Sequence, residues 1–227
     1  MTRKTNSRIA GIAFLFYIAA GILSMVLSRR GSGGAGIAAK LATISEHVTE
    51  MRLAYLLAFT TAFAALALGV TLYAITREED PDLAMLAMMC RVAEGVVGVS
   101  LPSTLVLIWL ATTTGSAAPD PGAAQAIGAF LLRLEGSTSL IAATLFAVGS
   151  TIFCWLLLRG RMIPVSLAWL GVAASALLVV ALPFQLAGFL GGLFVQLMWI
   201  PMAVFEVVAA IWLIVKGAAP SARRQPV

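Results

Sequence analysis

The sequence predicts an all-α polytopic membrane protein, a bundle of six transmembrane helices with one short interfacial helix. Three observations lead to this fold class. The 227 residues are 61% hydrophobic and only 11% charged, whereas a soluble domain is about half apolar and a quarter charged. The mean hydropathy is +1.00. Apolar runs long enough to cross a hydrocarbon layer recur along the chain, with most charged residues at their ends. We expect a single domain over residues 1–227.

The first predicted span covers residues 9–27 and follows a short segment with three basic residues. A secretory signal peptide also begins with a basic segment before an apolar one. This apolar run is long for a signal peptide, and Arg29 and Arg30 follow it without a nearby small-residue cleavage motif. We therefore expect a transmembrane helix that is retained.

Residues 37–51 are predicted to form an interfacial helix that leads into the second span, residues 53–75. Apolar residues at intervals of four and three place one apolar stripe on this helix: Ile37, Leu41, Ile44, Val48 and Met51. His47 and Glu50 could act as metal ligands. Two candidate ligands are few for a metal site, so a solvated surface pair is the preferred interpretation.

The third predicted span covers residues 83–110 and the fourth covers residues 137–158. Each is preceded by an Asp-Pro pair, a combination that suits the N-cap and first position of a helix. In the fourth case the pair is Asp120 and Pro121, so the helix can start near Ala123 and project beyond the hydrocarbon layer.

The fifth predicted span covers residues 163–182 and the sixth covers residues 193–215. The connection between them is apolar and rich in glycine, and Gly188 and Gly192 form a GxxxG pattern. Such a pattern can mark a contact between membrane helices. The density of glycine favours a flexible turn.

The distribution of lysine and arginine predicts that both termini are cytoplasmic, because cytoplasmic segments carry the excess of these residues. With that orientation nine basic residues are inside: Arg3, Lys4, Arg8, Arg77, Arg159, Arg161, Lys216, Arg223 and Arg224. Five are outside: Arg29, Arg30, Lys40, Arg52 and Arg133.

Three charged residues fall inside predicted spans: Arg91 and Glu94 in the third, and Glu206 in the sixth. A charge at mid-membrane costs roughly 2.5–3.5 kcal/mol, so we expect these side chains to face protein or water. One helical face is predicted to carry Ala87, Arg91, Glu94, Gly98 and Leu101. At a rise of 1.5 Å per residue, Arg91 and Glu206 lie about 13–15 Å from the inner surface. The sequence therefore predicts a buried charge cluster in which Arg91 contacts Glu206.

Arg133 and Glu135 are predicted to form a separate pair at the outer interface. Counting back from Arg159 places them about 36–39 Å away along the helix, beyond a hydrocarbon layer of roughly 30 Å. A solvated surface pair is the expected arrangement.

The sequence offers no catalytic constellation and no binding motif for a metal, a cofactor or nucleic acid. The only histidine is His47, too isolated to serve a serine nucleophile, and no zinc-protease or phosphate-loop motif occurs. The two cysteines, Cys90 and Cys154, lie within apolar segments without metal-ligand spacing.

Four motifs resemble those of a bacterial family of membrane proteins named domain of unknown function 4386. They are R-I-A-G-I-A-F-L-F-Y-I (residues 8–18), C-R-V-A-E (residues 90–94), R-G-R-M-I-P (residues 159–164) and F-E-V-V-A-A-I-W-L-I-V-K-G (residues 205–217). The resemblance covers nearly the whole chain. It implies six helices in a bacterial inner membrane and supplies no activity.

Two functions follow from the buried charges. In the first, the protein is a structural or interaction protein of the bilayer, able to form helix–helix oligomers, whose charge cluster locks helix packing. In the second, Arg91, Glu94 and Glu206 serve transport or sensing of a small solute or proton. A lipid-linked enzyme is a third, weaker possibility. A water-accessible cavity that reaches Glu94 or Glu206 would favour transport, and a dry, fully paired cluster would favour structure.

Overall fold

The computed structural model describes residues 1–99, 102–115 and 118–221. Over these residues the protein is helical and contains no strand. Six helical segments are long and apolar enough to cross a membrane, which confirms the predicted fold class. The first four are α1 (Arg3–Gly31), α3 (Val48–Thr76), α4 with α5 (Pro81–Val99 and Ser103–Thr112) and α6 (Pro121–Arg159). The others are α7 (Val165–Leu186) and α8 with α9 (Leu193–Leu197 and Ile200–Val215), and the short α2 (Ile37–Glu46) lies between the first two spans.

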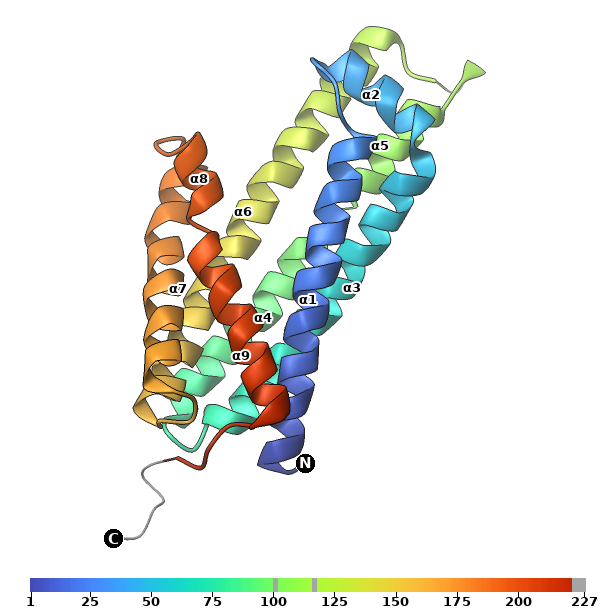
Figure 1. Cartoon of the computed structure of the whole chain (residues 1–227). Helices are drawn as coiled ribbons and strands as arrows, with labels where there is room; N and C mark the ends of the chain where they lie inside the picture. Colours follow the sequence, from blue (N-terminus) through green and yellow to red (C-terminus); the bar gives the residue numbers. More distant parts are fainter. Residues whose placement is uncertain (100–101, 116–117, 222–227) are drawn as a thin grey trace, which may run out of the picture.

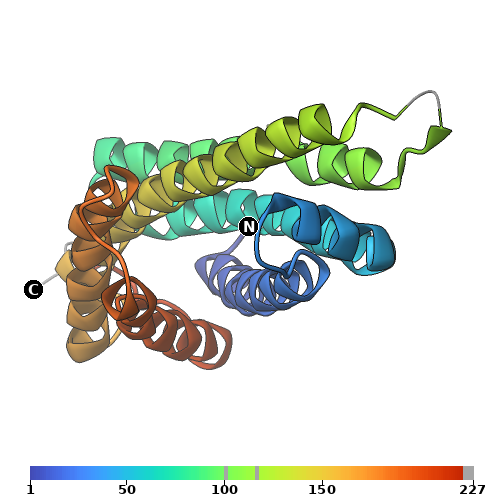
Figure 2. The same ribbon diagram turned by 90° about the horizontal axis from the view of Figure 1, so that it is seen from above.

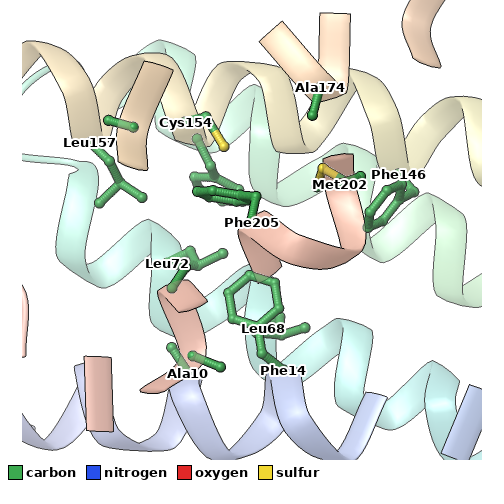
Figure 3. Close-up of a cluster of buried hydrophobic side chains, with 14 of the residues drawn as sticks. Ala10, Phe14, Leu68, Leu72, Phe146, Cys154, Leu157, Ala174, Met202 and Phe205 are labelled. Atoms are coloured by element: carbon green, nitrogen blue, oxygen red, sulfur yellow. The ribbon is translucent and has the colours of Figure 1, made fainter. Parts of the chain in front are cut away.

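The six spans pack side by side in a closed ring. In order around this ring, α1 contacts α3, α3 contacts α4, α4 contacts α6, α6 contacts α7, and α7 contacts α9. The ring closes because α9, the last of the described helices, also packs against α1. Figure 2 shows the arrangement from above. Apolar side chains from all six spans fill the interior, including Phe14, Leu68, Phe205 and Leu178, and Figure 3 shows part of this core.

Both ends of the described chain lie at one end of the bundle, here called the terminal end. Arg3 pairs with Glu78 there and donates a hydrogen bond to the carbonyl of Ala219. Arg159 approaches Asp80, with 3.7 Å between Nη1 and Oδ2. The opposite end, here called the far end, carries α2, α5 and α8 (Figure 1).

The longest of the described helices, α6, has 39 residues and is capped by Asp120 as predicted. The Asp120 carboxylate accepts hydrogen bonds from the backbone N–H groups of Gly122 (2.9 Å) and Ala123 (3.2 Å). At 1.5 Å per residue the helix is about 58 Å long, well beyond a hydrocarbon layer of roughly 30 Å. Its extra length leans toward α2 and α5 at the far end, away from α7 and α8 (Figures 1 and 2).

The third span is not the continuous helix that was predicted over residues 83–110. Its described parts are α4 (Pro81–Val99) and α5 (Ser103–Thr112), and Pro102 before α5 is not helical. Pro102 lies in the connection, and proline breaks a helix because it lacks a backbone N–H and its ring collides with the preceding turn. Pro102 lies eight residues beyond Glu94 in the sequence.

The segment 37–51 also differs from the prediction of one helix. It divides at His47, where α2 ends and α3 begins. The apolar stripe still buries Ile44 and Met51, which pack with Leu107 and Ile108 of α5. The stripe therefore covers another helix of the same chain.

The glycine-rich connection before α8 is a turn, as the glycine density indicated. Gly188 and Gly192 have φ angles of +84° and +68°, a backbone conformation that favours glycine. The preceding helix, α7, extends through Pro183 to Leu186 instead of ending at residue 182. Pro183 lies in its last turn, where a missing N–H removes a single backbone hydrogen bond.

Candidate functional site: a buried charge cluster beside a groove

Arg91 lies in the middle of the ring with only 2% of its surface exposed. Two glycines on neighbouring helices make room for it. A Cβ atom at Gly69 of α3 would lie 3.2 Å from the Arg91 Cβ. At Gly149 of α6 it would lie 3.0 Å from the Cys90 Cβ and 3.5 Å from the Arg91 Cγ. These small residues therefore let α3 and α6 close on the stem of the arginine.

The charge of Arg91 is matched by Glu94, one turn further along α4. The Arg91 Nη1 lies 2.8 Å from the Glu94 Oε2, with side-chain exposures of 2% and 6%. These two atoms form an ion pair but do not meet the geometry of a hydrogen bond. The hydroxyl of Tyr17 on α1 donates a hydrogen bond of 2.6 Å to the other oxygen, Oε1. Each Glu94 oxygen therefore has one partner, and the two come from different helices.

Two aromatic rings hold the guanidinium of Arg91. Its Cζ lies 5.1 Å from the centroid of the Tyr17 ring and 4.9 Å from that of Phe146 on α6. The two rings are nearly parallel, at 4° with centroids 6.3 Å apart. A cation over an aromatic face at this distance is stabilised by the negative face of the ring. Arg91 of α4 thus contacts the Glu94 carboxylate on its own helix, the Tyr17 ring on α1 and the Phe146 ring on α6.

Glu206 on α9 is the third predicted member of the cluster, and its pairing differs from the prediction. Its side chain is buried, with 6% exposed. Among the described residues, no ion pair within 4.0 Å joins it to Arg91, so the predicted contact between these two residues is wrong. Glu94 pairs with the Arg91 guanidinium because both residues lie on the same face of α4, one turn apart. The Oε1 of Glu206 is buried without a hydrogen-bond partner.

A cavity of about 390 Å³, here called the groove, lies beside the cluster. Glu94 and Glu206 both line it, together with Tyr17, Phe146 and Trp199. The rest of its wall is small or apolar and comes from α1, α6 and α9, with residues such as Gly21, Ala143, Met202 and Ala203. Two buried carboxylates therefore face a space large enough for a small molecule.

A second, polar cavity of about 130 Å³ adjoins the groove toward the far end. Gly98 and Ser139 line both spaces. Its other polar residues are Ser24, Ser28, Tyr55, Ser103, Thr104, Glu135 and Thr138. The residues that flank the break between α4 and α5 form part of its wall. The broken third span therefore lies along a polar continuation of the groove.

Toward the terminal end the interior is closely packed. The cavity on that side of Arg91 measures only about 20 Å³ and is lined by Phe14, Phe153, Phe205 and other apolar residues. Figure 3 shows Phe14, Leu72 and Phe205 in this region. The groove beside the carboxylates thus lies toward the far half of the bundle, whereas the terminal half is closely packed.

Arg133 and Glu135 lie in the far half of α6 but do not form the predicted pair. Arg133 is exposed, and among the described residues no ion pair joins it to Glu135. Glu135 instead accepts a hydrogen bond of 3.2 Å from the Thr104 hydroxyl of α5. Their spacing of two residues places them about 200° apart around the helix, on different faces.

The predicted polar face of the third span is partly described. Ala87 is fully buried, Arg91 and Glu94 are nearly so, and Gly98 faces the groove. Leu101, the last residue of that face, lies outside the described residues. No cluster of three metal-ligating side chains occurs in the described part of the chain.

The sequence analysis missed the aromatic residues of the site. Tyr17 could have been noticed from the sequence, because tyrosine in membrane proteins is enriched at the interfaces and is unusual in the middle of a span. Tyr17 is 14 residues beyond Arg3 and so about 21 Å along α1, deep in the span. A mid-span tyrosine needs a partner for its hydroxyl. Phe146 and Trp199 carried no comparable signal.

The family of the chain follows from a comparison over most of its length. The model of the family described as Domain of unknown function (DUF4386) matches residues 9–217, and the chain belongs to this family. The resemblance drawn from four motifs is therefore confirmed. Comparisons with curated proteins and with solved structures found no match. Arg91, Glu94 and Glu206 all lie within the matched range.

Proposed function

We propose that this family member admits a small solute or a proton from the outer side of the bacterial cytoplasmic membrane and transports or senses it. The observation that carries the proposal is the groove of about 390 Å³ lined by Glu94 and Glu206. Ionisable groups inside a membrane are expensive, and those that line a cavity mark ion or substrate pathways in membrane proteins.

The proposed orientation places the terminal end in the cytoplasm. It is supported by the excess of lysine and arginine in segments at that end. Glu206 lies ten residues before Lys216, about 15 Å along α9 from that end. Ser139, which lines the groove near its far end, lies 20 residues before Arg159 and thus about 30 Å along α6. The groove would then run from mid-membrane to the outer surface.

The broken third span supports transport or sensing over a purely structural role. Discontinuous helices whose ends meet at a binding site are a feature of many transporters. Here the residues beside the break line the polar cavity that continues the groove. Transport would need a second arrangement that opens the packed terminal half. Sensing would need only the arrangement described.

A structural role is the second candidate, and a different part of the cluster favours it. Arg91, Glu94, Tyr17 and Phe146 satisfy one another across three helices. Such buried polar contacts can fix how helices pack. Glu206 makes no hydrogen bond or ion pair with any described residue of this network, so a purely structural role for the cluster does not explain its presence. The two candidates therefore differ most at Glu206.

Thiol labelling tests whether water reaches the groove. In a variant with Cys90 and Cys154 replaced by alanine, a cysteine is placed at position 203 or at position 204. Ala203 lines the groove, whereas its neighbour Val204 is 49% exposed and does not line it. An impermeant, charged thiol reagent added outside should label position 203 and spare position 204, because thiols in lipid do not ionise. Equal protection of both positions would contradict an aqueous groove.

Flux measurements test the function itself. Proteoliposomes containing a pH-sensitive dye report proton movement driven by a membrane potential or by an added solute gradient. We expect the wild-type signal to fall at least fivefold in Glu206→Gln and to persist in Glu46→Gln. The control makes the same change at an exposed carboxylate on α2. A folded Glu206→Gln variant whose proton flux equals that of the wild type would favour the structural role.

A further inference from the structure

We infer that the groove binds an organic ammonium ion, with the positive group against Glu206 and the apolar body against Phe146 and Trp199. This inference rests on the proposed function and names the class of solute. It is drawn from the charge balance of the cluster, the chemistry of the groove wall and the size of the space.

The charge balance leaves one negative charge without a contacting cation. Arg91 is committed to Glu94 by the 2.8 Å ion pair. Glu206 is 94% buried, because only 6% is exposed, and its Oε1 has no hydrogen-bond partner. A buried charge is costly unless it is paired. A single positive charge bound in the groove would supply the missing partner.

The groove wall suits an organic cation better than a metal ion. Calcium takes six to eight oxygen ligands, and magnesium keeps a nearly octahedral set. Glu94 and Glu206 are the charged oxygen donors of the groove, and Glu94 already has two partners. Most of the remaining wall is apolar or aromatic. An alkylated ammonium ion sheds water more easily than a metal ion and fits such a wall.

The aromatic rings already hold a cation from the protein itself. The Arg91 guanidinium lies against Tyr17 and Phe146. Trp199 adds a further ring, with its centroid 6.3 Å from that of Phe146 and a tilt of 35°. Aromatic side chains around a cation are a common means of recognising quaternary ammonium groups, and tryptophan is the most effective of them. Phe146 therefore contacts both the guanidinium of Arg91 and the ring of Trp199.

The size of the groove favours a molecule over a bare ion. Small-molecule sites usually measure about 300–1,000 Å³, and the groove measures about 390 Å³. Met202 lines it near Glu206, and the flexible methionine side chain adapts to ligands of different shape. Anions are disfavoured by the two carboxylates, and an uncharged molecule would leave Glu206 unpaired.

Calorimetric titration of the purified protein in an uncharged detergent tests the inference. The probes are choline, benzyltrimethylammonium and 3,3-dimethylbutan-1-ol, the uncharged isostere of choline in which carbon replaces nitrogen. We expect saturable binding of both cations, tighter for benzyltrimethylammonium because of its aromatic body. The isostere should bind at least tenfold more weakly than choline. Equal binding of choline and its isostere would overturn the inference.

Matched variants locate the site. Glu206→Gln should weaken binding at least tenfold, Glu206→Asp should bind more weakly than wild type but still prefer the cation, and Glu46→Gln should bind like wild type. Trp199→Leu should weaken binding several-fold, whereas Trp169→Leu, at an exposed position on α7, should not. Size-exclusion chromatography checks that each variant is folded. Unchanged binding in folded Glu206→Gln would place the cation elsewhere and overturn the inference.

The thiol labelling described above separates this inference from the function on which it rests. If position 203 is labelled from outside but no cation binds, the groove is aqueous and only the ammonium class is wrong. If position 203 is protected and no cation binds, the proposed function is wrong as well.

Discussion

Arg91 and Glu94 form an ion pair within a single turn of α4, with 2.8 Å between Nη1 and Oε2 and both side chains more than nine-tenths buried. The pair is local in sequence but is completed by Tyr17 and Phe146 from two other helices. Because Glu94 takes the guanidinium, Glu206 is left facing the groove. The two buried carboxylates therefore differ: Glu94 is paired with the cation, and the Oε1 of Glu206 has no hydrogen-bond partner.

Replacing Arg91 by leucine should destabilise the protein by about 3–5 kcal/mol, because it leaves Glu94 buried without its cation. Arg91→Leu combined with Glu94→Leu should recover part of this loss. Arg91→Leu combined with Glu206→Leu should recover less. The free energy of unfolding in mixed micelles measures all three. Equal recovery in the two double variants would contradict the assignment of Glu94 as the partner.

Tyr17→Phe should lower the free energy of unfolding by about 1–3 kcal/mol, since the Oε1 of Glu94 would lose its hydrogen-bond donor in a buried site. The aromatic face against Arg91 would be retained, so the effect isolates the hydroxyl. Tyr55→Phe is the control, because the Tyr55 hydroxyl, unlike that of Tyr17, makes no side-chain hydrogen bond with another described residue. Equal stability of Tyr17→Phe and the wild type in chemical unfolding would argue against the 2.6 Å contact.

Gly149→Ala should destabilise the bundle, since the new Cβ would lie 3.0 Å from the Cys90 Cβ and 3.1 Å from the Ala87 carbonyl oxygen. Helices α4 and α6 would have to move apart beside Arg91. Gly136→Ala, on the same helix but with nothing within 4 Å of the new atom, should be neutral or slightly stabilising, because alanine favours helix by up to about 1 kcal/mol. Thermal unfolding in detergent should rank the two in that order.

The orientation can be measured with reporter fusions. A reporter joined after Arg77 or after Arg161 should give a cytoplasmic signal, and one within residues 112–119 should give an external signal, because lysine and arginine are retained inside. The reverse pattern would place the far end, and with it the polar cavity that continues the groove, on the cytoplasmic side. The proposal would then need uptake from that side.

The order and number of the spans could be predicted because they depend on local composition. Long apolar runs must satisfy their backbone groups internally in lipid, so they form helices wherever they occur. The cap at Asp120 followed from one residue and its neighbours. Burial of Arg91 followed from the cost of a charge in lipid.

The partner of Arg91 could not be predicted from depth alone. Arg91 and Glu206 were expected at the same depth in the membrane. Equal depth does not determine how far apart two residues lie across the ring or in which direction their side chains point. The aromatic contacts depend on how α1 and α6 are turned about their axes, which no single span reveals. Pro102 is evident in the sequence, but the length of the apolar run led to the prediction of one helix over residues 83–110. The prediction of a pair at Arg133 and Glu135 neglected the angle between neighbouring side chains on a helix.

The closure of the ring by α9 against α1 has a consequence for how the protein is made. Of the six spans, α1 is synthesised first and α9 last, and these two contact each other, so the ring of six stays open until α9 has been made. During that interval α4 can already lie in the bilayer as a neutral segment, because Arg91 and Glu94 neutralise each other without help from later helices. Glu206 arrives on the closing span. Glu206 therefore enters the membrane after the other five spans, including α1 and α7, against which α9 packs, have been made.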